Sequence, residues 1–395
     1  MQILVLNSGS SSLKFQLFSM PDETIICSGV IERIGFNDAV FKYKNQKETI
    51  ELESQILSHK TALKLVSQYL LDKDYGVIKT PEDIAIVGHR VVHGGSYFTD
   101  TAVITKEVKE KIRFLSSLAP LHNPPNLEGI EVAEDIFPNA KQVAVFDTAF
   151  LQSIPEVAYK YAIPNEFLTE HQIRLYGFHG TSHKYVSEKT IEFLGKKESK
   201  IITIHLGNGC SMTAIKNGKS VDHSMGFSPL NGLIMGTRSG DIDPSIIFYL
   251  KDKLKYHLKE INTLLNKKSG MLGLTGYSDL RDIEIMAAKG NTDCILALHM
   301  SAYRIKKYIG SYAAVLNGLD GIVFTGGIGE NSTLMRQLVC EDLEFLGIQI
   351  NENKNNEKSS GIRNINEDKS PVTILVVPTN EELEIAKQAM HLIKN

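Results

Sequence analysis

The chain has 395 residues, 42% hydrophobic and 23% charged, which is enough apolar sequence for two or three globular domains. A formal net charge of −3 offers no basic surface for nucleic acid or an anionic membrane, and no apolar run approaches the about 18 residues of a membrane span. The N-terminus lacks the basic start of a signal peptide. The cysteines, Cys27, Cys210, Cys294 and Cys340, are far apart and form no CxxC pair. We therefore expect no disulfide framework, no structural zinc and a cytoplasmic location.

Strand-like and helix-like segments alternate along the chain, which favours an α/β fold. Apolar runs typical of buried strands occupy residues 84–87, 142–146, 201–206, 321–324 and 372–377. Apolar residues recur at helical spacing in residues 59–71, 127–136, 182–194, 283–288, 293–316 and 381–393. The long 293–316 segment predicts a core or interface helix. Residues 351–370, rich in Asn, Lys, Glu and Ser, predict an exposed, mobile loop without evident chemistry.

The most informative segment is the start of the chain. An apolar run over residues 3–6 breaks into Asn7-Ser8-Gly9-Ser10-Ser11-Ser12, and a second strand-like run begins at once and includes Lys14. This predicts the tip of a strand-turn-strand hairpin. Small residues let backbone N–H groups crowd around an anion, while hydroxyl groups and Lys14 add donors and charge, so a phosphate is the expected ligand. An ordinary Ser/Gly hairpin is the alternative, and the absence of a Walker A motif excludes a P-loop.

A weak internal repeat supports the phosphate interpretation. Residues 204–211, which read Ile-His-Leu-Gly-Asn-Gly-Cys-Ser, echo residues 4–11 and are also followed by an apolar run. Two similar loops about 200 residues apart predict a duplicated fold with one phosphate loop in each half, although chance recurrence of short Gly/Asn hairpins is the alternative. A third glycine cluster at 326–331 follows a buried-type strand. It predicts a glycine-rich turn that approaches a nucleoside, with a helix beginning at Ser332.

Several charged residues and histidines lie in loop-like settings. Arg90 follows a strand, just before a glycine pair, and Arg238 lies in a loop of small residues. A guanidinium group binds carboxylates and phosphates in a fixed fork, but either arginine could instead be a salt-bridge partner. His122, His179 and His205 also lie in loops, where a lone histidine is more often structural than catalytic.

Two carboxylates follow strand-like runs. Asp147 ends an apolar run, where a carboxylate can cap a helix or take part in catalysis. Glu381 follows a Pro378-Thr379 pair, and here Thr379 and Glu382 fit a capping box. The functional alternative makes Glu381 a carboxylate near a hydrated Mg²⁺ ion.

Taken together, these segments resemble the acetate and propionate kinase family over residues 1–394. The most specific matches are the loop from Asn7 to Lys14 and the segment His89-Arg90-Val91-Val92-His93-Gly94-Gly95, with further matches at 178–183, 205–209 and 326–331. The resemblance implies the actin-like ATPase, sugar kinase and heat-shock ATPase fold, with two duplicated α/β domains and an interdomain cleft. The expected domains are 1–148 with 382–395, on the acyl-substrate side, and 149–381, on the nucleotide side.

The same resemblance implies the reaction. The expected activity is reversible transfer of the ATP γ-phosphoryl group to acetate, by direct in-line transfer and with Mg²⁺ or Mn²⁺, in a homodimer. A propionate or other short-chain carboxylate kinase is the alternative within this class. An actin-like or chaperone-like ATPase is the alternative from another class, and it would have no use for an acyl site.

The resemblance also assigns roles residue by residue. Asp147, His179 and Arg238 are the expected catalytic residues, and Asn7 and Glu381 the expected metal ligands. Acetate is already ionised at neutral pH, so we expect Asp147 to orient Arg238 or a metal-bound water rather than to act as a base. The expected acyl-substrate residues are Arg90, Val92, Leu121, His122, Phe178 and Pro229. The expected nucleotide contacts come from the loops above and one further segment: Ser10, Ser12, Lys14, His205, Leu206, Gly207, Asn208, Gly209, Asp279, Leu280, Arg281, Gly327, Ile328, Gly329, Glu330 and Asn331.

Overall fold

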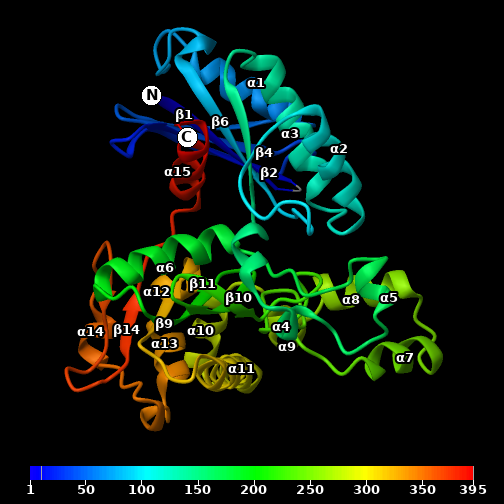
Figure 1. Ribbon diagram of the computed structural model, residues 1–395, viewed down its shortest axis with the longest axis vertical. Helices are drawn as coiled ribbons and strands as arrows, with labels where there is room; N and C mark the ends of the chain where they lie inside the picture. Colours follow the sequence, from blue (N-terminus) through cyan, green and yellow to red (C-terminus); the bar gives the residue numbers. More distant parts are fainter. Residues whose placement is uncertain (10, 395) are drawn as a thin grey trace. The chain divides into compact units, whose positions relative to one another are not determined.

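A computed structural model describes residues 1–9 and 11–394 of the chain (Figure 1). Two compact units make it up: unit 1 is Met1–Phe150 with Asn380–Asn395, and unit 2 is Leu151–Thr379. The chain therefore passes from one unit to the other twice, at Phe150–Leu151 and at Thr379–Asn380. Within the described residues, no helix is both long enough and apolar enough to cross a membrane.

Unit 1 is built on an eight-stranded mixed sheet in the order β5-β4-β3-β2-β1-β6-β8-β7. Its strands are β1 (Gln2–Ser8), β2 (Ser12–Ser19), β3 (Thr24–Glu32), β4 (Ala39–Asn45), β5 (Thr49–Ser54), β6 (Ile84–Val91), β7 (Ala102–Val103) and β8 (Lys141–Phe146). Its helices are α1 (His59–Leu70), α2 (Lys106–Phe114), α3 (Asn123–Ile136) and α15 (Glu381–Lys394).

Helices cover both faces of this sheet, which explains why β1 reads as a continuous apolar run rather than an alternating one. Leu4 and Leu6 belong to the same buried cluster as residues of α1 and α3. On the other face, α15 packs on β1 and β6. Gly88 permits this approach, because a Cβ there would lie 2.9 Å from Ile385 Cγ2. The C-terminal helix is therefore part of the core of unit 1.

Unit 2 contains a six-stranded sheet in the order β11-β10-β9-β12-β14-β13. Its strands are β9 (Lys200–Leu206), β10 (Cys210–Lys216), β11 (Lys219–His223), β12 (Gly321–Thr325), β13 (Arg363–Asn364) and β14 (Thr373–Val376). Its helices are α4 (Glu156–Tyr159), α5 (Glu166–Thr169), α6 (Gly180–Leu194), α7 (Ser245–Asp252), α8 (Leu258–Lys267), α9 (Gly270–Thr275), α10 (Leu280–Ala288), α11 (Thr292–Leu316), α12 (Gly326–Asn331), α13 (Thr333–Cys340) and α14 (Glu352–Asn356).

The two sheets repeat one topology, which confirms the predicted duplication. In unit 1, β2 pairs antiparallel with β1 and β3, β1-β6-β8 run parallel, and β7 is antiparallel to β8. In unit 2, β10 pairs antiparallel with β9 and β11, β9-β12-β14 run parallel, and β13 is antiparallel to β14. Both predicted strand-turn-strand loops are thus tips of equivalent hairpins.

Two expectations for the C-terminal third of the chain are wrong. The glycine cluster is not a turn but the short helix α12, which follows β12 directly; the helix expected from Ser332 is confirmed as α13, which begins at Thr333 with Ser332 as its N-cap. Glycine is needed where α12 begins, because Gly326 has a φ of +77° and a Cβ there would lie 2.7 Å from the Leu206 carbonyl oxygen.

Residues 351–370 do not form an open loop either. They contain α14 and β13, and Asn355 and Ile365 are buried. The Asn355 carboxamide and carbonyl both accept hydrogen bonds from the buried guanidinium of Arg336. A polar composition therefore conceals a segment fixed by contacts with α13.

Candidate active site

The first phosphate loop is the tip of the β1–β2 hairpin. Asn7 lies opposite Lys14, the ladder closes one pair later with Ser8 opposite Leu13, and the Gly9 amide donates to the Ser12 carbonyl oxygen at 2.8 Å. Two side chains hold the loop from outside: the Asn126 amide donates to the Ser8 carbonyl oxygen at 2.6 Å, and His59 Nε2 lies 2.7 Å from the Gly9 carbonyl oxygen. Ser12 is half-buried and Lys14 is exposed, while Ser10 lies outside the described residues.

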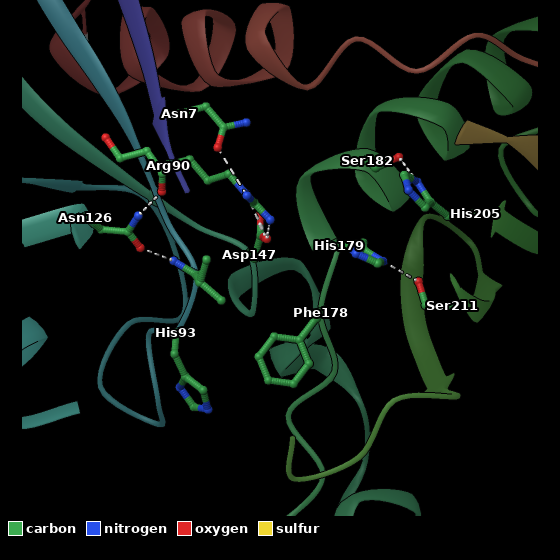
Figure 2. Close-up of polar contacts among 12 residues, drawn as sticks. Asn7, Arg90, His93, Asn126, Asp147, Phe178, His179, Ser182, His205 and Ser211 are labelled. Carbon is green, nitrogen blue, oxygen red and sulfur yellow. Dashed lines mark hydrogen bonds and ion pairs between the residues drawn. The ribbon is translucent and has the colours of Figure 1, made fainter. Parts of the chain in front are cut away.

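Arg90 and Asp147 form an ion pair at the edge where the parallel strands β6 and β8 end. Side chains at the carboxyl ends of neighbouring parallel strands meet at one edge of a sheet. Arg90 Nε donates to Asp147 Oδ2 at 2.9 Å, and Arg90 Nη1 donates to Asn7 Oδ1 at 3.1 Å (Figure 2). Asp147 is only 1% exposed. Within unit 1 the cation beside Asp147 is Arg90, while Arg238 belongs to unit 2, so the expected pairing of Asp147 with Arg238 stays a prediction.

Glu381 adds a second acid to this group. It is the first residue of α15, and Asn380 caps that helix with its side chain, accepting from the Leu383 amide at 3.0 Å. The predicted Thr379–Glu382 capping box is therefore wrong. The pKa of Glu381 is raised to about 7, chiefly by burial; Arg90 and Lys14 act to lower it, while the negative charges of Asp147 and Glu382 act to raise it.

These residues suit a hard cation. Carboxylate and amide oxygens are the donors that Mg²⁺ prefers, and Mg²⁺ usually keeps several waters beside one or two carboxylates and substrate phosphates. Asn7, Asp147 and Glu381 offer that donor set in unit 1. Among the described residues, no cluster of three or more His, Cys, Asp or Glu side chains forms a self-sufficient metal site.

The expected acyl-site residues are divided between the units. Val92 is buried, and its amide donates to Asn126 Oδ1 at 3.0 Å. Leu121 is exposed, and His122 precedes α3. Phe178, which is buried, and Pro229 belong to unit 2. Because the four apolar side chains come from both units, the methyl pocket stays a prediction.

Unit 2 brings His179 and Arg238 to the second phosphate loop. His179 precedes α6 in the left-handed region, with a φ of +59°, which is uncommon for a residue with a side chain. Its ring stacks on His205 with centroids 4.5 Å apart, and Arg238 Nη1 donates to the Pro229 carbonyl oxygen at 3.1 Å. A Cβ at Gly209 would lie 3.4 Å from His179 Nε2 and 3.8 Å from Arg238 Nη1, so the glycine lets both groups approach the loop.

Unit 2 contains a cleft of about 790 Å³, which lies within the range of about 300–1,000 Å³ that is typical of ligand pockets. Eight of the expected nucleotide residues line it: Gly207, Asn208, Asp279, Leu280, Arg281, Gly327, Ile328 and Asn331. Leu206 lines an adjoining small cavity instead. The Glu330 carboxylate accepts from the Gly326 and Thr379 amides at 3.0 and 3.1 Å, and so braces α12.

The cleft also contains residues that we did not anticipate: Ser278, Glu284 and Ser332. Ser332 Oγ donates to Glu284 Oε1, which joins the starts of α13 and α10. Only proximity in sequence to Asp279 and Asn331 could have indicated Ser278 and Ser332, and nothing in the sequence marks Glu284.

Comparison with known proteins decides the family. Residues 2–387 match the acetokinase family. An acetate kinase of Flavobacterium johnsoniae is 62% identical over 395 residues, covering all of both chains, and one of Clostridium acetobutylicum is 50% identical over 401 residues, covering 100% of this chain and 99% of its own. This chain belongs to the acetokinase family.

Solved structures agree with the family assignment. The crystal structure of Porphyromonas gingivalis acetate kinase has a TM-score of 0.94 at 45% identity, covering 99% of both chains. That of a propionate kinase from Francisella tularensis has a TM-score of 0.92 at 43% identity, with the same coverage. The resemblance inferred from the motifs is thereby confirmed, as is the fold of two mixed α/β sheets.

In this family member, the motifs found the charged residues but not the side chains that hold them. Asn126 joins the phosphate loop to Val92, Ser211 contacts His179, and Ser182 contacts His205 (Figure 2). Asn126 and Ser8 are separated by 118 residues, and Ser211 and His179 by 32. Such pairs become visible only once the strands are placed.

Proposed function

We propose that this acetokinase-family chain transfers the γ-phosphoryl group of ATP to acetate, giving acetyl phosphate and ADP, and catalyses the reverse reaction by the same direct in-line transfer. The observation that carries the proposal is the full-length similarity to acetate kinases, at 62% identity in the Flavobacterium protein. Phosphoryl transfer asks a protein mainly for positioning and charge neutralisation, which suits a site built from arginines, histidines and phosphate loops.

Arg90 is the proposed carboxylate-binding residue. Asp147 accepts from Nε and Nη2 of its guanidinium group and Asn7 accepts from Nη1, so that the planar cation is held in one orientation at the edge of the unit 1 sheet. Asp147 then acts by orienting Arg90 rather than as a base. Acetate and ATP are both anions, and a preorganised cation offsets their repulsion at little reorganisation cost.

His179 and Arg238 are the proposed stabilisers of the transferring phosphoryl group. Both approach Gly209 of the second phosphate loop. Burial lowers the pKa of Arg238. A guanidinium group is nevertheless always charged in proteins, so Arg238 supplies a cation. No covalent nucleophile is required, because the acetate oxygen attacks phosphorus directly. The cleft lined by Asp279, Arg281 and Gly327 is the proposed nucleotide site.

Asn7 and Glu381 are the proposed protein contacts of a hydrated Mg²⁺ ion, with Mn²⁺ as an alternative. The ion would bridge the ATP phosphates and neutralise charge there. A nearby cation would also favour the ionised form of Glu381, whose pKa burial raises to about 7.

Propionate is the second candidate acceptor, because a propionate kinase structure superposes with a TM-score of 0.92. Val92, Leu121, Phe178 and Pro229 are the proposed walls of a pocket for one methyl group. A hydrophobic pocket discriminates one methylene by about 1–3 kcal/mol, or roughly 10–200-fold. We expect acetate to be preferred within that range and butyrate to be a poor substrate.

The test is a hydroxamate assay for acyl phosphate across a series of carboxylic acids, with kcat/KM for each. A preference for propionate would transfer the assignment to the second candidate. Val92→Ala should narrow the acetate/propionate ratio by improving propionate, and an unchanged ratio would remove Val92 from the pocket. ATP hydrolysis without any acyl phosphate would favour an actin-like or chaperone-like ATPase instead.

A homodimer formed through unit 2 and a cytoplasmic location complete the proposal. Unit 2 exposes apolar side chains on and after α7, which supports an interface there. They are Ile246, Phe248, Tyr249, Leu254, Tyr256 and Leu258.

A further inference from the structure

Unit 2 contains a cluster of histidines behind the second phosphate loop, and the proposed reaction uses only part of it. His183 and His223 are buried, with ring centroids 5.3 Å apart, and His183 also lies 6.2 Å from the ring of His205. His205 in turn stacks on His179. Each buried histidine ring can be protonated on Nδ1, on Nε2 or on both, and its hydrogen-bond partners decide which.

A chain of hydrogen bonds runs from the core to His179. The His179 Nδ1 atom lies 2.9 Å from Ser211 Oγ, and Ser211 Oγ lies 2.7 Å from His183 Nε2. The His183 Nδ1 atom is 2.7 Å from Thr203 Oγ1. Ser211 and Thr203 are both fully buried. A serine hydroxyl has one proton, so Ser211 can donate to only one of its two histidines and must accept from the other.

His183 is the neutral member of this chain. Burial, followed by the neighbouring His223 and His205, lowers its pKa well below the usual value. A neutral imidazole has one donor nitrogen and one acceptor nitrogen. Two arrangements are therefore consistent with the contacts, and they run in opposite directions.

In the first arrangement, Thr203 donates to His183, His183 Nε2 donates to Ser211, and Ser211 donates to His179 Nδ1. A neutral His179 then carries its proton on Nε2. In the second, His179 Nδ1 donates to Ser211, Ser211 to His183 Nε2, and His183 Nδ1 to Thr203. This arrangement accommodates a charged His179, which again has a proton on Nε2, whereas a neutral His179 would here carry its only proton on Nδ1. No heavy atom needs to move between the two.

We propose that Ser211, backed by His183 and Thr203, is a positioning residue that donates to Nδ1 of neutral His179 and accepts from Nδ1 of charged His179, so that Nε2 carries a proton in both states. The proposal rests on the proposed role of His179 as a donor to the phosphoryl group. The Nε2 atom is the one that faces Gly209 and the Arg238 side of the loop. The titratable or charged groups near His179 in the described part of the chain include His183, His205 and Arg238, and His183 is joined to it through Ser211.

The test compares two buried hydroxyls. Ser211→Ala breaks the chain of hydrogen bonds. Thr213→Val removes a buried hydroxyl that lies 2.8 Å from His223 Nδ1 and is not a member of that chain. One net hydrogen bond biases a tautomer by roughly three- to tenfold. At high pH His179 is neutral, and the fraction of it that carries a proton on Nε2 depends on that tautomer bias. At low pH the charged ring has a proton on both nitrogens, so the bias no longer matters. We therefore expect kcat of Ser211→Ala to fall about three- to tenfold more at pH 8.5 than at pH 6.0.

Thr213→Val, and Ser211→Thr, which retains the hydroxyl, should change kcat equally at the two pH values. An equal loss at both pH values in Ser211→Ala would overturn the proposal. Nitrogen-15 NMR of histidine-labelled wild type provides a second measurement that needs no variant to fold: neutral His179 must carry its proton on Nε2, and a proton on Nδ1 would overturn the proposal.

His179→Ala separates this proposal from the function on which it rests. If His179→Ala stays active, the role of His179 in phosphoryl transfer fails. If His179→Ala is inactive while Ser211→Ala shows no pH-dependent loss, only the positioning role of Ser211 fails.

Discussion

At the scale of single residues, the unit 1 site is a problem of charge balance. Asp147 is buried and paired with Arg90, and Arg90 also favours the charged form of the half-buried Glu381 at the start of α15. Breaking a buried ion pair by removing one partner costs more than the pair itself contributes, because the other charge is left without compensation. Arg90 is therefore expected to affect both catalysis and folding.

Arg90→Ala should lower kcat/KM for acetate by about 10²–10⁴-fold, as expected for a lost charge donor in the transition state. It should also lower the melting temperature, because removal of one partner of a buried pair costs about 3–5 kcal/mol. The double variant Arg90→Ala, Asp147→Asn separates these effects. Its melting temperature should recover while its activity does not, and recovery of activity would contradict the assignment of Arg90 to the carboxylate.

The sequence was sufficient to find the charged residues of the site and insufficient to find their partners. Arg90 stands out because it lies before a glycine pair at a strand end, a local pattern. Asn126 shows no such pattern, since its importance lies in joining Ser8 to Val92 across the ends of two strands. Asp147 was found, but its partner was not, because register between β6 and β8 decides which side chains meet.

At the scale of elements, the candidate site residues lie where strands end. The β1–β2 and β9–β10 hairpins were predictable because small residues interrupt two apolar runs in the same way. The helical state of α12 was not, because three glycines in six residues argue against a helix by propensity alone. Tertiary contacts override this: Arg336 Nη1 donates to the carbonyl oxygens of Gly329 and Glu330 at the end of α12, and Glu330 accepts from the Gly326 amide at its start.

The first turn of α15 offers a controlled test of the proposed metal site. Glu381 and Glu382 are neighbouring carboxylates with similar effects on the helix dipole, each about 0.3–1 kcal/mol. Glu381→Gln should raise the Mg²⁺ concentration needed for half-maximal activity and slow turnover. Glu382→Gln should leave the Mg²⁺ dependence unchanged. Titration of activity against Mg²⁺, with a melting curve for each variant, would refute the metal role of Glu381 if the two variants behaved alike.

At the scale of the whole molecule, the exposed apolar side chains of α7 have a predicted use. Phe248 is 64% exposed, together with Tyr249 and Leu258 nearby. If this surface forms the homodimer interface, Phe248→Asp should shift the sedimentation coefficient of the protein toward that of a monomer at micromolar concentration. Phe193→Asp provides a matched control, because Phe193 is also an exposed aromatic residue of unit 2, on α6. Equal behaviour of the two variants would place the interface elsewhere.

The duplicated architecture predicts closure of the two units during catalysis. One phosphate loop belongs to unit 1, at the β1–β2 hairpin, and the nucleotide cleft and second loop belong to unit 2. In-line transfer requires reacting atoms to approach to about 3–3.5 Å with water excluded, so groups from both units must reach the same phosphoryl group. The chain crosses between units at Phe150–Leu151 and Thr379–Asn380, just after Asp147 and just before Glu381, where small backbone rotations could act as a hinge.

Small-angle scattering can measure this closure. The radius of gyration should fall when saturating Mg²⁺, acetate and a non-hydrolysable ATP analogue are all present, and it should fall less with acetate alone, which cannot connect the two units through a triphosphate. Arg238→Ala supplies the control, because it removes a unit 2 phosphoryl contact and leaves the unit 1 cluster intact. It should bind acetate and compact less. A wild-type radius of gyration that stays constant, with ligand binding verified by calorimetry, would mean that both sets of groups already reach one phosphoryl group without motion.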